Sequence, residues 1–261
     1  MTGSTARGTA LVTGASEGIG RALASALAAD GYTVTGIARN EARLRAVIDG
    51  LGEGGHAALV ADLATEDGLE RVVDGVQQGR FDVLVNNAGT ASSGPFVDVP
   101  LERATAMMNL NCHALLTLAH AFLTGAQPGG ALVNVSSTLA FAPMANLSVY
   151  SATKAFVTSF SESLWHEHKA RGVYVMGLCP GMTSTRSQPH SGADVPAGLV
   201  QSPEQVAATA LAALHRRKQP TVICGTKNTL FAAVARALPR RAALRILTPQ
   251  RQSPAYHRTP L

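Results

Sequence analysis

Short apolar runs alternate with longer amphipathic stretches along most of the chain. The apolar runs are bounded by Gly, Asp, Asn or Ser and predict strands at 9–13, 33–38, 57–61, 83–85, 131–136, 173–178 and 221–224. The amphipathic stretches predict helices at 19–29, 41–48, 66–76, 101–122, 149–170 and 203–215. Strands that alternate with helices predict an α/β fold with a doubly wound parallel sheet that is flanked by helices.

Two further signals refine this pattern. Ser202 followed by Pro203 is typical of a helix start, with Ser202 as the N-cap and Pro203 at the first helical position. In a doubly wound sheet, ligands bind at the carboxyl ends of the strands, near the point where the strand order reverses. The residues that follow each predicted strand are therefore the candidates for function.

Composition adds few constraints. With 261 residues and 46% hydrophobic content, the chain can form one large domain over residues 1–261. No apolar run reaches the roughly 18 residues that a membrane span needs, so we expect a cytoplasmic protein. The three cysteines lie in apolar segments, which favours buried thiols over disulfides or a metal site.

The charge is unevenly distributed. From Gln205 onward there are ten Lys or Arg residues and no Asp or Glu. We predict a basic helical extension at about 227–261 that packs on the core or on a neighbouring subunit, with its arginines in solvent. A surface for anionic lipid or an acidic partner is the alternative, and we expect no membrane association. The basic residues accompany no nucleic-acid recognition module.

A glycine-rich segment follows the first predicted strand and leads into a helix. It is Thr-Gly-Ala-Ser-Glu-Gly-Ile-Gly at 13–20. Glycines there let the main chain approach a pyrophosphate, and the helix N-terminus offers free N–H groups to it. The predicted cofactor contacts from this segment are Gly14, Ser16, Gly18, Ile19 and Gly20.

The end of the second predicted strand indicates which dinucleotide binds. An NAD site places an acidic residue there, but this chain has Ala38 and then Arg39. A guanidinium suits a 2′-phosphate, so NADP(H) is favoured over NAD(H). Arg39 could instead be an ordinary surface arginine, and Glu17 is a counter-signal because a basic residue at that position would add to the phosphate site.

The ends of the third and fourth predicted strands point to the same place. Asp62 could accept a hydrogen bond from an adenine amino group, with Leu63 beside it, or Asp62 could be the N-cap of the helix that begins near Thr65. Residues Asn87, Ala88 and Gly89 could border the adenosine ribose. A bare turn explains these three almost as well.

Tyr150 and Lys154 are the strongest candidates for chemistry. They stand four residues apart on one predicted helix face, so an ammonium can lie beside a phenol. A free phenol has a pKa of about 10, and a nearby positive charge lowers it. Ser137 ends an apolar strand 13 residues before Tyr150, which can bring a hydroxyl to the same place.

Taken together, these motifs resemble the short-chain dehydrogenase/reductase family over residues 9–226. The resemblance implies a Rossmann-type, doubly wound, seven-stranded parallel sheet in three α/β/α layers. It also implies a nicotinamide cofactor, a homodimer or homotetramer, and a small carbonyl or alcohol substrate. Tyr150 would be the general acid and base, Lys154 would lower its pKa and bind the nicotinamide ribose, and Ser137 would hydrogen-bond the substrate oxygen. Asn111, with Asn109 as a rival, would hold a water beside Lys154.

The resemblance also covers a turn after the sixth predicted strand. Pro180, Gly181, Thr183 and Thr185 would border the nicotinamide carboxamide, although loop capping could explain both threonines. Phe141, Met144 and Leu147 would line the substrate pocket and suggest a hydrophobic carbonyl compound. The stretch 184–200 would form a lid, and its His190 is expected to be solvent-exposed.

Two functions follow from this. The first is an NADP(H)-dependent oxidoreductase that interconverts a carbonyl group and an alcohol. The second is a non-catalytic dinucleotide sensor or scaffold with the same fold. The retention of Tyr150, Lys154 and Ser137 favours the enzyme.

Overall fold

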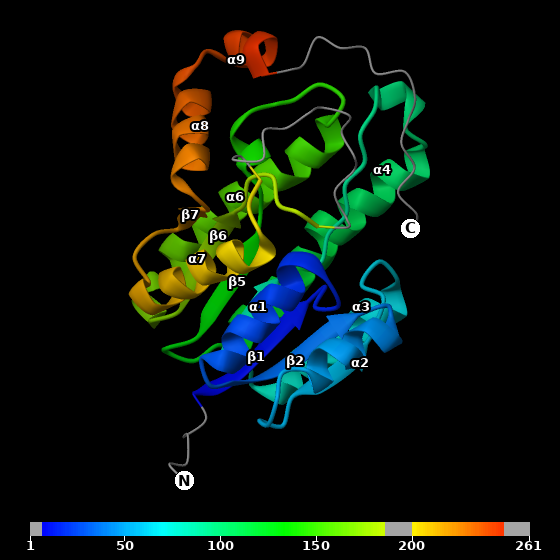
Figure 1. Ribbon diagram of the computed structural model, residues 1–261, viewed down its shortest axis with the longest axis vertical. Helices are drawn as coiled ribbons and strands as arrows, with labels where there is room; N and C mark the ends of the chain where they lie inside the picture. Colours follow the sequence, from blue (N-terminus) through cyan, green and yellow to red (C-terminus); the bar gives the residue numbers. More distant parts are fainter. Residues whose placement is uncertain (1–6, 186–199, 248–261) are drawn as a thin grey trace.

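Seven parallel strands form one sheet in the order β3-β2-β1-β4-β5-β6-β7 (Figure 1). The computed structural model describes residues 7–185 and 200–247. The strands are β1 (Gly8–Thr13), β2 (Tyr32–Ala38), β3 (Ala57–Val60), β4 (Val83–Asn86), β5 (Ala131–Val135), β6 (Tyr174–Cys179) and β7 (Thr221–Ile223). The order reverses between β1 and β4, as in a Rossmann fold. The predicted fold class is confirmed.

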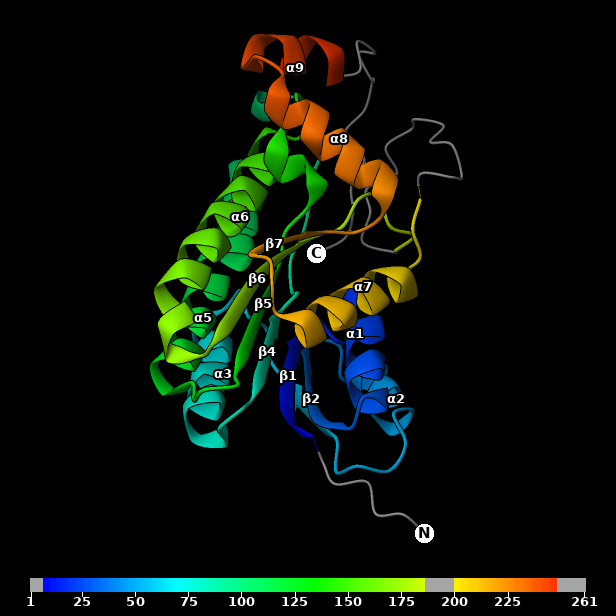
Figure 2. The same cartoon turned by 90° about the vertical axis from the view of Figure 1, so that its left-hand side faces the viewer.

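Helices cover both faces of the sheet. The helices are α1 (Gly18–Ala29), α2 (Glu41–Asp49), α3 (Glu66–Gly79), α4 (Leu101–Met108), α5 (Leu115–Gly125), α6 (Ser148–His168), α7 (Pro203–Arg216), α8 (Thr226–Ala237) and α9 (Arg240–Leu247). Figure 2 shows α1, α2 and α7 on one face and α3, α5 and α6 on the other. The chain therefore forms the expected three layers.

Each face of the sheet has its own apolar core. Successive strand residues point to opposite faces, so Val12 packs with the first core, beside α1, α2 and α7, and Leu11 packs with the second, beside α3 and α5. Both side chains are fully buried. Because both faces are covered, the strands read as near-continuous apolar runs, which is why they were visible in the sequence.

The sequence pattern predicts one helix over 101–122, but the structure divides it. A π-helical segment, η2 (Asn109–Ala114), joins α4 to α5. A π turn holds one residue more than an α turn, and such turns often occur at functional sites. The apolar spacing does not show this insertion, because both flanking helices keep their own α-helical period.

The predicted start of α7 is confirmed. The Ser202 side chain accepts a hydrogen bond from the Gln205 N–H at 3.2 Å, and the Gln205 side chain accepts one from the Ser202 N–H at 2.9 Å. This capping box satisfies two N–H groups that a helix start would otherwise leave without partners. Beyond this start, α7 packs beside α1 in the first core.

Two helices, α8 and α9, follow β7 in the part of the chain that the structure describes. Helix α8 buries Ala232 and Ala235 and contacts the 3-10 helix η3 (Thr138–Phe141). Arg236 is exposed, and its guanidinium also stands 4.2 Å from the centre of the Phe141 ring. Within residues 7–185 and 200–247, no helix has the length and apolar character needed to cross a membrane.

Candidate active site

The glycine-rich segment between β1 and α1 is tightly packed. Gly14 and Gly18 have φ values of 66° and 54°, which other residues rarely adopt. A Cβ atom at Gly20 would lie 2.1 Å from the Gly14 carbonyl oxygen, so only glycine fits there. Ser16 is partly buried, and Ile19 packs against the first core. The main chain can thus approach a ligand closely at the start of α1.

Side chains from neighbouring strands fasten this segment. The Thr13 hydroxyl accepts hydrogen bonds from the N–H groups of Asn87 and Ala88, both at 2.9 Å. The Asn87 side chain donates to the Thr13 carbonyl at 2.9 Å and to the Gly14 carbonyl at 3.3 Å. A bare turn therefore does not account for Asn87: its amide connects the end of β4 to the glycine-rich segment.

The ends of β1, β2 and β3 carry paired charges. Arg39 lies 3.7 Å from Asp62, and Arg43 lies 2.8 Å from Glu17. The N-cap of α3 is Thr65, whose hydroxyl accepts from the Gly68 N–H, so Asp62 is not the cap.

Two residues near Asp62 complete this edge. The Asp62 side chain accepts from the Ala64 N–H at 2.9 Å, which holds the turn after β3. Leu63 is buried in the second core and does not face solvent.

Ser137 and Tyr150 meet beyond the end of β5. Ser137 is the N-cap of η3, and its oxygen accepts from the Leu139 N–H at 3.2 Å. Its hydroxyl also hydrogen-bonds the phenol of Tyr150, in the first turn of α6. The structure thus brings together a strand end and a helix start that are 13 residues apart in the chain.

The structure differs from the expected effect of Lys154 on Tyr150. Burial raises the pKa of Tyr150, and the hydrogen bond from Ser137 lowers it by less. The Lys154 Nζ stands 5.7 Å from the centre of the phenol ring and donates to the Val135 carbonyl at 2.9 Å. The sequence argument considered charge alone, whereas desolvation of the phenol has the larger effect here.

Lys154 is itself buried. Its exposed fraction is 6%, and burial lowers its pKa to about 8. Its main-chain carbonyl accepts from the Ser136 hydroxyl at 2.8 Å, and that hydroxyl also pairs with Thr158 at 2.7 Å. Both ends of this residue are therefore fixed to the end of β5.

Asn111 lies inside the π-helical segment and is buried, whereas Asn109 is exposed. The Asn111 amide accepts from the Thr90 N–H and donates to the Thr90 carbonyl, both at 2.9 Å. It also donates to the Thr153 hydroxyl at 3.2 Å. The side chain thus connects the segment after β4 to α6, one residue before Lys154.

Gly89 lies between these groups. A Cβ atom there would stand 3.0 Å from the Asn111 Oδ1 and 3.7 Å from the Lys154 Nζ. A larger residue would press on the Asn111 amide. The absence of a side chain leaves space immediately beside the lysine.

The turn after β6 reaches the same region. Pro180 is buried, and its carbonyl accepts from the Thr138 N–H at 2.9 Å. Thr185 packs on Gly18 so closely that a Cβ atom on Gly18 would lie 3.0 Å from the Thr185 methyl carbon. The Thr183 hydroxyl donates to the Gly181 carbonyl at 3.0 Å, which is the loop capping considered as an alternative. His190 and most of the expected lid lie outside the described residues.

Helix α8 supports this turn through residues that the sequence pattern did not single out. The Asn228 side chain covers Gly181 so closely that a Cβ there would lie 2.3 Å from its Nδ2. Asn228 also donates to the Gln201 side chain at 3.0 Å and to the Cys224 carbonyl at 2.7 Å. Asn228 lies 47 residues beyond Gly181 in the chain, and no motif marks the pair.

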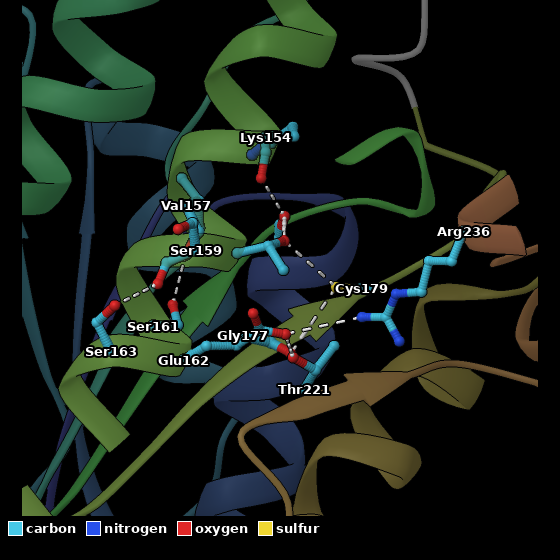
Figure 3. A network of polar contacts seen from close by, with 12 residues as sticks. Lys154, Val157, Ser159, Ser161, Glu162, Ser163, Gly177, Cys179, Thr221 and Arg236 are labelled. Carbon is cyan, nitrogen blue, oxygen red and sulfur yellow. Dashed lines mark hydrogen bonds and ion pairs between the residues drawn. The ribbon is translucent and has the colours of Figure 1, made fainter. Parts of the chain in front are cut away.

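A second connection from α8 runs to α6. Arg236 lies 3.7 Å from Glu162, which accepts a hydrogen bond from Thr221 at 2.5 Å (Figure 3). Arg236 also stacks on Phe141, four residues after Ser137. The basic helix α8 therefore helps to hold the 3-10 helix that borders the Ser137–Tyr150 pair.

The family model for short chain dehydrogenases matches residues 8–195. The chain belongs to the short-chain dehydrogenase/reductase family. A short-chain dehydrogenase from Pseudocercospora fijiensis (strain CIRAD86) is 39% identical over 181 residues, which cover 66% of this chain and 59% of that protein. The match therefore spans less than two thirds of that relative.

Solved short-chain dehydrogenases/reductases cover more of the chain. The enzyme from Sphingobium yanoikuyae, in complex with NADPH, is 34% identical, with a TM-score of 0.77 over 95% of this chain and 98% of that one. The bulky-bulky ketone specific alcohol dehydrogenase from Comamonas testosteroni is 29% identical, with a TM-score of 0.74 over 88% of this chain and 93% of that one. Further neighbours of similar fold contain NADP or NADPH.

Proposed function

We propose that this protein is an NADP(H)-dependent oxidoreductase that interconverts a ketone or aldehyde and the corresponding alcohol. The observation that carries the proposal is the hydrogen bond between Ser137 and Tyr150, with the buried Lys154 one helical turn further along α6. These three groups stand at the carboxyl edge of the sheet, where ligands of doubly wound folds bind.

The residues at the strand ends fit a nicotinamide dinucleotide. Gly14, Gly18 and Gly20 form a cradle that side chains would fill, at the N-terminus of α1. Arg39 would bind the 2′-phosphate, and the absence of an acidic residue at position 38 favours the phosphorylated cofactor. Neighbours that contain NADP or NADPH support the same choice.

The remaining cofactor contacts would come from three further segments. Asp62 with Leu63, and Asn87 with Ala88 and Gly89, would border the adenosine. Lys154 would bind the nicotinamide ribose. Residues Pro180, Gly181, Thr183 and Thr185 would border the nicotinamide. The packing of Thr185 on Gly18 connects this turn to the glycine-rich segment.

In this proposal the nicotinamide supplies or accepts the hydride. Tyr150 gives a proton to the carbonyl oxygen during reduction and takes it from the alcohol during oxidation. Ser137 donates a hydrogen bond to the same oxygen and fixes its position. Burial raises the pKa of Tyr150, so the phenol carries its proton at neutral pH but gives it up less readily than a free phenol does.

Asn111 would act as a positioning residue. Its amide is committed to Thr90 and Thr153, and Thr153 immediately precedes Lys154. This arrangement supports a role in holding the lysine and the segment after β4 in register. The Asn111 Nδ2 already donates to the Thr90 carbonyl and the Thr153 hydroxyl. A water beside Lys154 would therefore be bound chiefly by other atoms.

The substrate we propose is a small or medium-sized hydrophobic carbonyl compound. Phe141, Met144 and Leu147, between Ser137 and Tyr150, supply an apolar border. The ketone-specific neighbour supports a ketone. We further propose a homodimer or homotetramer, as the family resemblance implies.

A panel of ketones and aldehydes, followed by NADPH absorbance, tests this function. We expect turnover of at least one hydrophobic ketone and a higher kcat/KM with NADPH than with NADH. Tight NADPH binding without turnover of any compound in a broad panel would contradict the enzyme and favour a non-catalytic sensor. Titration calorimetry with NADPH separates that outcome from a misfolded preparation.

A further inference from the structure

Four charged side chains lie together at the ends of β1, β2 and β3. We call Glu17, Arg39, Arg43 and Asp62 the charged corner. Glu17 precedes α1, Arg39 follows β2, Arg43 is in the first turn of α2, and Asp62 follows β3. Two ion pairs, Arg43–Glu17 and Arg39–Asp62, connect these three strand ends.

The position of Arg43 is set by its helix start. Asn40 is the N-cap of α2, and its side chain accepts a hydrogen bond from the Arg43 N–H at 2.9 Å. From this turn the guanidinium reaches the glycine-rich segment, where its Nη1 stands 2.8 Å from the Glu17 Oε2. Arg43 thus extends across the space between the β1 and β2 ends, on the side where the adenosine ribose of a dinucleotide lies in this fold.

Helix α2 carries another arginine, Arg45, whose ion pair differs from that of Arg43. Arg45 pairs with Glu41 at 2.8 Å, but this is a local i,i+4 contact on the helix surface. The Arg43–Glu17 pair instead joins residues 26 positions apart on two different strand-end segments. Of these two pairs, the Arg43–Glu17 pair is therefore the one that reaches the glycine-rich segment of the proposed cofactor site.

The formal charges of the corner sum to zero, because two arginines stand with two carboxylates. A phosphate group carries about −1.5 to −2 at neutral pH and offers three acceptor oxygens. One arginine, already paired with Asp62, cannot neutralise it. Arg43 supplies a second guanidinium that could bind a phosphate through two hydrogen bonds, but it forms an ion pair with Glu17. Both members of that pair are partly exposed, so the contact can exchange for another anion.

We propose that Arg43 is a second ligand of the adenosine 2′-phosphate and that Glu17 competes with the phosphate for its guanidinium. Glu17 then sets how strongly the protein prefers NADP(H) over NAD(H). The inference rests on the proposed NADP(H) site and deepens it. It also gives a role to Glu17, the acidic residue that counted against a 2′-phosphate site in the sequence.

Titration calorimetry of the full chain with 2′,5′-ADP and 5′-ADP tests the proposal without turnover. Arg43→Gln should weaken 2′,5′-ADP binding about tenfold, and Glu17→Gln should strengthen it about threefold. Binding of 5′-ADP should change less than about twofold in both variants. Arg45→Gln is the matched control and should leave both affinities unchanged.

The double variant examines the competition itself. If Glu17 acts through Arg43, then Glu17→Gln should give no gain in a chain that already carries Arg43→Gln. A gain of the same size in both backgrounds, or an Arg43→Gln chain that binds 2′,5′-ADP as tightly as the control, would overturn the assignment. A wild-type chain that binds the two ligands equally would instead contradict the NADP(H) site as a whole.

Discussion

The proposed catalytic residues and the charged corner both lie at the carboxyl edge of the sheet, but different contacts hold them. Asn111, Ser136 and Lys154 are buried, and each bonds to main-chain atoms over 2.8–2.9 Å. The corner instead consists of ion pairs in which Arg39 and Arg43 are at least half exposed. Buried hydrogen bonds fix one geometry, whereas exposed ion pairs exchange partners at small cost. The first arrangement suits proton transfer, and the second suits a charged ligand that comes and goes.

The largest expected effect concerns Tyr150. Tyr150→Phe removes the proton donor, so kcat should fall about 10³-fold while NADPH affinity stays within about twofold. Steady-state kinetics and titration calorimetry measure the two quantities. Tyr174→Phe is the matched control, since that phenol is buried elsewhere and donates to the Gln219 carbonyl at 2.7 Å. Appreciable turnover by Tyr150→Phe would remove this residue as the donor.

Asn111 should have the next largest effect, on stability. Asn111→Ala leaves the Thr90 N–H and carbonyl without their partner, and the free energy of unfolding should fall by about 3 kcal/mol. Urea unfolding measures this change. Asn109→Ala, two residues earlier and exposed, should cost less than about 0.5 kcal/mol. An equal loss of unfolding free energy in the two variants would mean that the buried Asn111 amide stabilises the fold no more than the exposed Asn109 does.

Replacing Lys154 should increase the free energy of unfolding, whereas replacing Asn111 should decrease it. Its pKa falls from 10.5 to about 8 on burial, which corresponds to a penalty of about 3 kcal/mol while both folded and unfolded chains are protonated. Lys154→Met should raise the free energy of unfolding at pH 7 by about 2 kcal/mol, after the lost bond to Val135 is subtracted.

The pH dependence identifies the cause of that gain. Below about pH 8 the penalty is complete, and as the pH rises from there toward 10.5 the folded chain loses its proton first, so the penalty disappears. The advantage of Lys154→Met should shrink over the same range. Lys169→Met, which removes a lysine that lies over the Trp165 ring, is the matched control. A pH-independent gain would contradict a charge effect.

The smallest effect should come from the charged corner. Arg39→Asp should reduce the ratio of kcat/KM for NADPH to that for NADH by about tenfold, because Arg39 is more than half exposed and water screens its charge. Arg45→Asp controls for the change in net charge. A ratio that Arg39→Asp leaves unchanged would count against a 2′-phosphate contact at this residue.

Local patterns in the sequence predicted much of the fold and of the candidate site. The glycine-rich segment, the strand ends and the Tyr150–Lys154 spacing are all contiguous or nearly so. The contacts that the sequence did not reveal join distant positions, such as Asn228 over Gly181 and Arg43 with Glu17. The direction of the Tyr150 pKa shift was also hidden, because burial depends on the whole fold.

The π-helical segment between α4 and α5 has a consequence for the phase of the chain. An α-helix turns by about 100° per residue, and the π-helical segment holds one residue more in the same rotation. If this stretch were one unbroken α-helix of the same length, Leu115, Leu118 and Phe122 would lie about 100° away from the second core that they face. A one-residue deletion here would close the π turn to an α turn and keep those apolar side chains toward the sheet. The cost of the deletion should therefore fall on the contacts that Asn111 makes with Thr90 and Thr153, and not on the second core.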